Sequence, residues 1–389
     1  MSNVNRKPCV LHVSVVHHAD DPRIFERECR SLADHGYDVG YLCPGAPHEE
    51  RRDGVLLLSL PPRPRTQRLL YWPGIVRAVR RLAPAVVHVH DPELLALAPA
   101  LRALGPRVIY DMHEYVAQAV RGKYYIPPAL RPLAARAVGA VERTLAAHVD
   151  GVAAVVSRQF AALGARPEYR VLLPNYPRFS RFAEPHAVAE LAADPRLKLV
   201  HIGTLSPGRG VSVMLEAMRV AGDGCVLYLG GVFPDPSYEA EVKAELAGDL
   251  GSRVRLLGRI PPARLPDYLA AADVVWIAET GTPQYLLPAN STKLFEGMAS
   301  GLAVLTSDLP GRGDVVRAVR CGLAVPPTLE GHAAGLLELL DHRDQLGESG
   351  ARARQAVTER FSWEAIEDLL LEFYERVRFG DAGATATPR

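Results

Sequence analysis

The feature that most constrains the fold of this chain is an alternation of short β-branched runs with amphipathic helical segments. Residues 10–16 (VLHVSVV) predict a buried strand, residues 24–36 an amphipathic helix and residues 37–44 the next strand. Similar pairs of segments continue to residue 156. This alternation is typical of a parallel, doubly wound sheet with helices on both faces.

The pattern stops at residues 172–187 (LLPNYPRFSRFAEPHA), which are rich in proline and aromatic residues, and restarts at residue 198. The length of 389 residues is that of two domains. We therefore expect an α/β fold of two Rossmann-like domains that face each other across a cleft at the carboxyl ends of both sheets. The expected parts are a first domain at 1–175, a linker at 176–187, a second domain at 188–360, a closing helix at 361–378 and a flexible tail at 379–389.

Charge and cysteine content exclude several classes of protein. Residues 1–180 carry 24 Lys and Arg against 16 Asp and Glu, which is less than the dense basic stripe that nucleic-acid binding needs. The five cysteines are scattered and form no CxxC pair, so neither a disulfide framework nor a zinc knuckle is indicated. No signal peptide and no run of 18 apolar residues is present. We expect a cytoplasmic protein that does not bind nucleic acid.

The first candidate site is the segment GTLSPGRG, which lies between a predicted strand and a predicted helix. Gly203, Gly208 and Gly210 allow a turn whose backbone amides can hold a phosphate, and Arg209 adds a positive charge. The segment is neither a Walker A loop nor a GxGxxG dinucleotide motif. A tight turn without a ligand is the alternative interpretation.

The second candidate site is the helix start in NSTKLFEG. Asn290, Ser291 and Thr292 are good N-cap residues, and Glu296 follows one turn later. Lys293 lies in the first turn, where a cation opposes the helix dipole, so a bound anion explains it better than helix stability does. An exposed lysine of small energetic cost is the alternative. Both candidate sites follow strands of the same predicted sheet and could hold one diphosphate.

Histidines at strand ends form a third candidate site. His88 and His90 alternate on one strand, His17 and His18 follow the first strand, and His113 ends another. Zinc is disfavoured because no HExxH motif or matched carboxylate spacing accompanies these residues. We expect structural roles for His88 and His90, and for His113 either a substrate contact or a hydrogen bond to a loop.

Two further segments have both a functional and a structural interpretation. The stretch at 61–82 combines six arginines with Tyr71 and Trp72, which suits either weak contact with an anionic membrane surface or a solvated helix face. The loop RGKYYIPP places Tyr124 and Tyr125 where they could stack on a sugar or pack against the protein.

Several segments in a fixed order resemble glycosyltransferase family 4, whose members are retaining enzymes of the GT-B fold. They are DPRIFERECRSLADHGYDV, YDMHE, LLPNYPRF, HIGTLSPGRGVSVMLEAM, RVRLLGRIPPARLPDYLAAADVVW, STKLFEGMASGLAVLTSD and FSWE. The resemblance implies an N-terminal acceptor domain, a C-terminal nucleotide-sugar domain and a final helix that crosses back to the first domain.

The resemblance also implies roles for individual residues. Arg209 stands where the family has a lysine that binds the donor diphosphate, Glu296 where a glutamate binds the ribose, and His113 where a histidine lies near the transferred sugar. Thr204 replaces an arginine that often clamps phosphate, and Pro288 replaces a glutamate that touches the sugar. The expected donor-binding residues are Gly203, Thr204, Arg209, Asn290, Ser291, Thr292, Lys293 and Glu296; the expected acceptor-binding residues are Asp21, Arg23, His113, Glu114 and Tyr124.

The resemblance implies a retaining hexosyltransferase that moves a sugar from a nucleoside-diphosphate sugar to a small-molecule or glycan acceptor. Arg209, Lys293 and backbone amides would stabilise the departing diphosphate, so neither a metal nor a further cofactor is expected. His113, Arg209 and Lys293 are the expected catalytic residues. A sugar-nucleotide epimerase of similar fold and a non-catalytic nucleotide-sugar-binding protein are the alternatives, and the sequence leaves the oligomeric state open.

Overall fold

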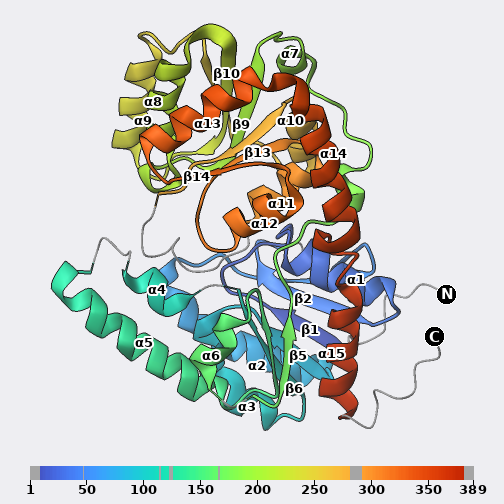
Figure 1. Ribbon diagram of the computed structural model, residues 1–389. Helices are drawn as coiled ribbons and strands as arrows, with labels where there is room; N and C mark the ends of the chain where they lie inside the picture. The colour runs from blue at the N-terminus through green and yellow to red at the C-terminus, as the bar shows by residue number, and fades with distance from the viewer. Residues whose placement is uncertain are drawn as a thin grey trace. The chain divides into compact units, whose positions relative to one another are not determined.

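A computed structural model describes residues 9–46, 48–113, 115–121, 126–164, 167–280 and 291–380 (Figure 1). The chain divides into two compact units. The first consists of Met1–Pro174 and Ile366–Arg389, and the second of Asn175–Ala365. Among the described residues, no helix is long and apolar enough to cross a bilayer.

The described part of the first unit is built on an eight-stranded sheet in the order β3-β4-β2-β1-β5-β6-β7-β8. All neighbours are parallel except the hairpin of β3 and β4. The strands are β1 (Val10–Val13), β2 (Val39–Pro44), β3 (Glu50–Arg52), β4 (Val55–Leu60), β5 (Val86–Val89), β6 (Arg107–Met112), β7 (Gly151–Ala154) and β8 (Tyr169–Leu172). From β1 the chain first adds strands on one side of the sheet and then, from β5 on, adds them on the other side. The carboxyl ends of β1 and β5 are therefore a ligand-binding position in such folds.

Helices cover the first sheet, and their apolar sides supply its core. They are α1 (Arg30–Asp34), α2 (Trp72–Leu82), α3 (Ala98–Arg102), α4 (Val116–Arg121), α5 (Arg131–Ala146), α6 (Arg158–Leu163) and α15 (Glu367–Phe379), with short π- or 3₁₀-helical segments at Ile24–Cys29, Arg65–Tyr71, Pro92–Leu97 and Pro128–Leu130. Helix α15, the last described helix, packs on β8 (Figure 1).

Side chains alternate along the strands of the first sheet and therefore enter two different layers. Leu11, Val13, Val87 and Val89 join an apolar cluster with α2 and α3. The intervening residues of β1 and β5 point to the opposite face and include fully buried histidines. That face therefore carries a buried polar layer.

The described part of the second unit contains a six-stranded, entirely parallel sheet in the order β11-β10-β9-β12-β13-β14. The strands are β9 (Leu197–Thr204), β10 (Cys225–Val232), β11 (Val254–Gly258), β12 (Val274–Ile277), β13 (Ala303–Ser307) and β14 (Gly322–Val325). The helices are α7 (Ala189–Ala192), α8 (Val211–Ala221), α9 (Pro236–Leu246), α10 (Leu265–Ala270), α11 (Thr292–Ala299), α12 (Arg312–Val319), α13 (Leu329–Asp341) and α14 (Leu346–Ala356), with single-turn segments at Phe179–Phe182, Pro207–Arg209, Gly222–Gly224, Pro262–Arg264, Arg343–Gln345 and Val357–Phe361.

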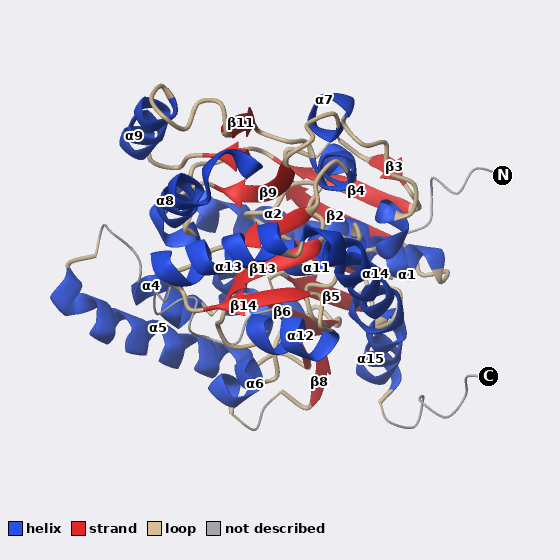
Figure 2. Ribbon diagram, turned by 45° about the horizontal axis from the view of Figure 1, so that its top comes forward, coloured by secondary structure: helices blue, strands red, loops and turns tan. Residues whose placement is uncertain are grey.

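Two apolar clusters lie on opposite faces of the second sheet because strand side chains alternate. One joins β9 and β12 to α8 and α13, and the other joins the same strands to α11, α12 and α14 (Figure 2). The segment expected as a linker packs with the second cluster, where Phe182 is fully buried. Its aromatic side chains therefore make it part of the second unit.

Candidate functional site: a basic cluster and a histidine pocket

The carboxyl ends of β9 and β12 meet where the strand order of the second sheet reverses. Gly203 lies near the end of β9, Gly208 and Gly210 lie in the loop after it, and Glu279 lies just beyond β12. Helix α11 begins at Thr292, with Ser291 as its N-cap residue and without a side-chain hydrogen bond at that cap. Two of the segments singled out in the sequence therefore belong to one edge of one sheet, which is the usual ligand position in such folds.

Lys293 lies directly over Gly203. A Cβ atom at Gly203 would come 2.5 Å from Cε of Lys293, and Gly203 has a φ of 151°. A side chain here would displace the end of the lysine side chain, and the backbone conformation at Gly203 favours glycine. The glycine loop and the start of α11, predicted separately from the sequence, are thus brought into contact.

The loop that carries Arg209 is held against the end of β12. A Cβ atom at Gly210 would lie 1.8 Å from the carbonyl oxygen of Ala278, and Gly210 has a φ of 79°. The amide of Thr280 donates a hydrogen bond of 3.3 Å to the carbonyl of Gly208. This close approach places Arg209 beside Glu279, with which it forms an ion pair and a hydrogen bond.

Glu279 is the centre of the basic cluster, which we define as Arg209, Glu279, Lys293 and Arg312. Its carboxylate is fully buried and lies 2.6 Å from Nη2 of Arg312 and 4.0 Å from Nζ of Lys293. Burial raises the pKa of Glu279, but the charges of Arg312, Lys293 and Arg209 outweigh burial and hold that pKa below its ordinary value. Within the cluster three positive charges face one negative charge, and the carboxylate of Glu296 on α11 also acts on Lys293.

Lys293 is the member of the cluster whose charge can change near neutral pH. Burial, together with the nearby Arg209, lowers the pKa of Lys293 to about 8. Fully buried His201, on β9, faces the same charges, and burial followed by Lys293 lowers its pKa to about 4. His201 is therefore neutral near pH 7, and the positive charge lies on the arginines and the lysine.

Sequence reasoning missed Glu279 and Arg312. Glu279 directly follows an apolar strand and Arg312 opens α12, and neither position belongs to a motif. A charged residue at the end of a buried strand was the available signal for Glu279. Of the other expected donor residues, Thr204 is exposed, while Ser291, Thr292 and Glu296 are half-buried on or next to α11. Asn290 and Pro288 lie outside the described residues.

A pocket of about 380 Å³ opens at the carboxyl ends of β1, β5 and β6 in the first unit. Its lining includes Val16, His17, Arg68, His90, Asp91, Asp111 and His113. The ring centroids of His17 and His113 lie 5.1 Å apart in an edge-to-face arrangement. The pocket thus contains imidazoles and carboxylates that can hydrogen-bond a hydroxylated molecule.

Each of these two histidines is oriented by a carboxylate. Nδ1 of His113 lies 3.1 Å from Oδ2 of Asp111, and Nδ1 of His17 lies 2.8 Å from Oδ2 of Asp21. Burial lowers the pKa of His17, but its hydrogen bond and charge interaction with Asp21 raise it overall above the ordinary value. Asp21 also accepts hydrogen bonds from the amides of Arg23 and Ile24, which begin the helical segment Ile24–Cys29.

Arg23 is only 6% exposed, and its guanidinium forms a fork on Asp111 rather than pointing into solvent. Nε and Nη2 donate to the two carboxylate oxygens at 2.8 and 2.7 Å. This geometry assigns Arg23 to the support beneath His113. Glu114 and Tyr124, also expected to bind acceptor, lie outside the described residues.

His90 lines the pocket, His88 does not, and both are fully buried. His90 contacts Asp111 and His12 through its two ring nitrogens, at 3.1 and 2.9 Å. His88 contacts the hydroxyl of Tyr374 at 2.7 Å. Hydrogen bonds within the protein therefore involve both histidines.

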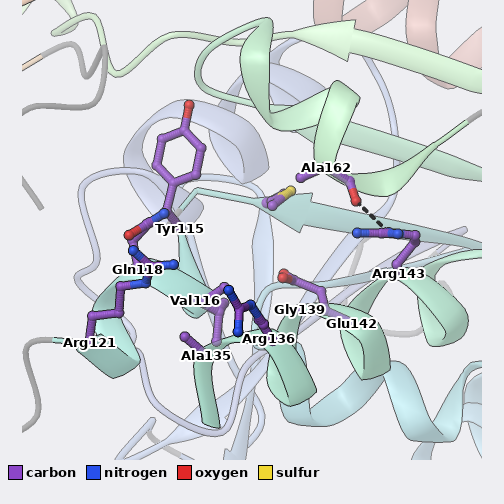
Figure 3. Close-up of a pocket in the computed structure, with 12 residues that line it drawn as sticks. Tyr115, Val116, Gln118, Arg121, Ala135, Arg136, Gly139, Glu142, Arg143 and Ala162 are labelled. Atoms are coloured by element: carbon purple, nitrogen blue, oxygen red, sulfur yellow. Dashed lines mark hydrogen bonds between the residues drawn. The ribbon is translucent and has the colours of Figure 1, made fainter. Parts of the chain in front are cut away.

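A second cavity of about 340 Å³ lies between α4, α5 and α6 (Figure 3). Arg121, Arg136 and Arg143 are at its lining, and Nε of Arg143 donates to the carbonyl of Ala162 at 3.0 Å. Glu142 accepts a hydrogen bond of 2.8 Å from the hydroxyl of Tyr110. The cavity shares Val116 with the histidine pocket but is lined by none of its histidines.

Two doubly wound α/β units, one with a basic cluster at its switch point and the other with a histidine pocket, define a protein of the GT-B class. Two family models match the chain: "Glycosyl transferase 4-like domain" over residues 23–176 and "Glycosyl transferases group 1" over residues 196–342. The chain belongs to glycosyltransferase family 4, and it is a glycosyltransferase. The resemblance inferred from its motifs is thereby confirmed.

Related proteins agree with this assignment. The phosphatidyl-myo-inositol mannosyltransferase of Mycolicibacterium smegmatis is 26% identical over 364 residues, which are 89% of this chain and 87% of that protein. The D-inositol 3-phosphate glycosyltransferase of Rhodococcus erythropolis is 29% identical over 259 residues, covering 64% and 57% of the two chains.

Solved structures share the fold. Sucrose-phosphate synthase from Thermosynechococcus elongatus has a TM-score of 0.76 at 19% identity, covering 95% of this chain and 98% of that one. HepE from Anabaena, in complex with UDP-glucose, has a TM-score of 0.71 at 14% identity, covering 94% and 98%.

Proposed function

We propose that this glycosyltransferase takes its sugar from a nucleoside-diphosphate sugar whose diphosphate binds at the basic cluster. The observation that carries the proposal is the convergence of three cations, Arg209, Lys293 and Arg312, on Glu279 beside the start of α11. Positive charges held close together need a counter-charge, and the two phosphates of a sugar nucleotide supply negative charge. Arg209 and Lys293, which are both partly exposed, would turn to the phosphates while Arg312 stays on Glu279.

The reaction breaks the bond between the anomeric carbon and the phosphate oxygen and forms a bond from the same carbon to an acceptor hydroxyl. Negative charge grows on the leaving diphosphate, and Arg209, Lys293 and the amides at Ser291 and Thr292 would stabilise it. The hydroxyl proton passes to the departing phosphate oxygen. Attack from the face that the phosphate leaves retains the anomeric configuration, as we propose for this enzyme. Because these cations can neutralise the leaving group, we propose that no divalent metal and no further cofactor take part.

We propose that the histidine pocket holds the acceptor and the reacting end of the sugar. Two imidazoles oriented by carboxylates are suited to hydrogen-bonding sugar or polyol hydroxyls. The names of the inositol-linked relatives make inositol-containing acceptors a first choice for testing. Five cysteines without a disulfide support a reducing cytoplasm as the site of the reaction.

We also propose weak contact with an anionic membrane surface through the segment Arg65–Tyr71. Leu69 and Leu70 are each 58% exposed there, and exposed Arg63 and Arg77 flank them in the sequence. Exposed leucines next to arginines suit the boundary between lipid headgroups and acyl chains.

The decisive experiment for the donor is thermal unfolding of the full chain with UDP, GDP, ADP and their glucose or mannose conjugates, followed by turnover with an inositol acceptor. A ligand that binds only the folded protein must raise the melting temperature. We expect one nucleoside diphosphate and its sugar conjugate to do so. We expect the conjugate to release its nucleoside diphosphate only when acceptor is present. No shift with any of them would contradict the proposal, and sugar-nucleotide conversion without acceptor would indicate an epimerase.

A further inference from the structure

A continuous chain of buried side chains runs beneath the histidine pocket, from helix α15 to Asp111. His12 and His88 are paired in register on β1 and β5, and both point to the face of the sheet covered by α15. Tyr374 of α15, His12, His88, His90 and Asp111 are each at most 1% exposed. We call this set the histidine chain.

Hydrogen-bond distances connect every member of the histidine chain. The hydroxyl of Tyr374 lies 2.7 Å from Nδ1 of His88 and 3.2 Å from Nε2 of His12. Nδ1 of His12 lies 2.9 Å from Nε2 of His90, and Nδ1 of His90 lies 3.1 Å from Oδ2 of Asp111. Asp111 Oδ2 in turn is 3.1 Å from Nδ1 of His113, which lines the pocket.

The negative charge of Asp111 fixes which group donates and which accepts in each hydrogen bond of the histidine chain. Burial raises the pKa of Asp111, but the guanidinium fork of Arg23 together with the contacts to His113 and His90 outweighs burial and holds that pKa well below its ordinary value. An ionised carboxylate can only accept hydrogen bonds, so His90 and His113 must each donate to it from Nδ1. A neutral His90 then accepts at Nε2.

The same logic fixes the remaining protons. His12 donates from Nδ1 to His90, so its Nε2 accepts the hydroxyl proton of Tyr374, whose oxygen accepts from Nδ1 of His88. Burial lowers the pKa of all three buried histidines, which favours the neutral rings that this arrangement requires. Burial and the charge of Asp111 raise the pKa of the adjacent Glu28, which favours its neutral form.

Hydrogen bonds through Arg23 and through the histidine chain link Asp111 to both places where the polypeptide passes from one unit to the other. The first unit ends at Pro174, and Nη1 of Arg23 donates to the carbonyl of the preceding residue, Leu173, at 3.1 Å. The polypeptide returns at Ile366, and Tyr374 lies on the helix that follows. Hydrogen bonds from both passages therefore lead to the same carboxylate.

We propose that Tyr374, acting through His12 and His90 on Asp111, is a positioning residue that holds His113 with Nδ1 protonated and Nε2 presented to the pocket as an acceptor. The proposal rests on the proposed role of His113 in binding substrate. Without the hydroxyl of Tyr374, His12 loses the donor to its Nε2 and can protonate there instead. Its Nδ1 then no longer donates to His90, and the contact of His90 with Asp111, which also holds His113, is weakened.

The test is nitrogen-15 NMR of the histidine side chains in the full chain, which distinguishes the two neutral tautomers and needs no substrate. In the wild-type protein we expect His12, His90 and His113 to be protonated on Nδ1 alone, with His113 assigned from the spectrum of His113→Gln. In Tyr374→Phe we expect an Nε2-protonated form of His12 to appear and the Nδ1 signal of His113 to shift.

Tyr37→Phe is the matched control. The hydroxyl of Tyr37 donates to Glu375, which lies next to Tyr374 on α15, and the two tyrosine rings are 6.3 Å apart. Within the described residues, Tyr37 makes no hydrogen bond to a member of the histidine chain. We expect wild-type histidine signals in this variant.

Three results would overturn the proposal. One is a folded Tyr374→Phe protein with unchanged His90 and His113 signals. Another is a wild-type His90 protonated on Nε2, which needs no variant and so covers the case in which Tyr374→Phe does not fold. The third is a stoichiometric divalent ion bound by His12, Glu28, His88 and His90. One potential ligand atom from each of these four side chains lies within 4.8 Å of the others. None of these results bears on whether the protein transfers sugar.

Discussion

Replacing Glu279 with glutamine keeps the size of the side chain but removes the carboxylate on which Arg209, Lys293 and Arg312 converge. Glu279 is fully buried and Arg312 is 3% exposed, with 2.6 Å between their charged atoms. Removing one partner of a buried ion pair costs about 3–5 kcal/mol, because the other charge stays buried without compensation. We expect Glu279→Gln to lower the free energy of unfolding of the second unit by that amount, as measured by urea unfolding.

A diphosphate should restore much of this loss. In the variant the cluster has lost its one negative charge, so it gains more from binding an anion. We expect inorganic pyrophosphate to raise the melting temperature of Glu279→Gln by more than it raises that of the wild-type protein.

The control is Glu239→Gln on α9, which removes an i,i+4 pair with Lys243 at 2.7 Å on the surface of the same unit. Surface pairs contribute little to stability, so this variant should unfold like the wild-type protein and respond equally to pyrophosphate. Equal urea midpoints for Glu279→Gln and wild type would refute the argument from burial. An equal response to pyrophosphate would show that the cluster does not serve an anion.

Further expectations concern single residues of the two units. The pKa of Lys293, lowered to about 8 by burial and Arg209, predicts that pyrophosphate affinity falls as the pH rises through about 8; calorimetry should show no such fall for Lys293→Arg, whose guanidinium stays charged. Because the unfolded chain binds this proton up to its ordinary pKa of 10.5, the same lysine should make stability rise with pH above about 8. Arg209→Ala should lower kcat/KM by roughly 10²–10³-fold if the arginine stabilises the departing diphosphate, and unchanged turnover would remove it from the mechanism. Replacing Leu69 and Leu70 with aspartate should weaken sedimentation with anionic vesicles while leaving nucleotide binding intact, and unchanged sedimentation would exclude this segment as the contact.

The order of strands and helices was largely predictable because each element has its own periodic pattern. The predicted strand and the predicted helix on either side of GTLSPGRG correspond to β9 and α8. The hairpin of β3 and β4 was not predicted, although its turn, Asp53–Gly54, has the positive φ values of 46° and 79° that favour an Asp-Gly pair. That local signal was present but was not used.

The convergence of Lys293 on Gly203 was predicted only as a shared sheet edge, whereas the partners of Arg209 were not predicted at all. Glu279 follows the end of β12, and Arg312 is the first residue of α12. The distance between them depends on which strands are neighbours in the sheet. Neighbouring strands need not be consecutive in sequence, so motif spacing carries no information about this contact. The same holds for His12 and His90, which are 78 residues apart and 2.9 Å from each other.

The sequence by itself determined the two doubly wound units, the glycine loop and the family, because periodicity and motifs are properties of consecutive residues. Tertiary structure alone decided which charges face one another: it placed a buried glutamate among the cations of the second unit and ordered the histidines of the first unit between Tyr374 and Asp111. The physical reason is that charge interactions and hydrogen bonds depend on distances of a few ångströms, and these are set by strand order and packing rather than by position along the chain.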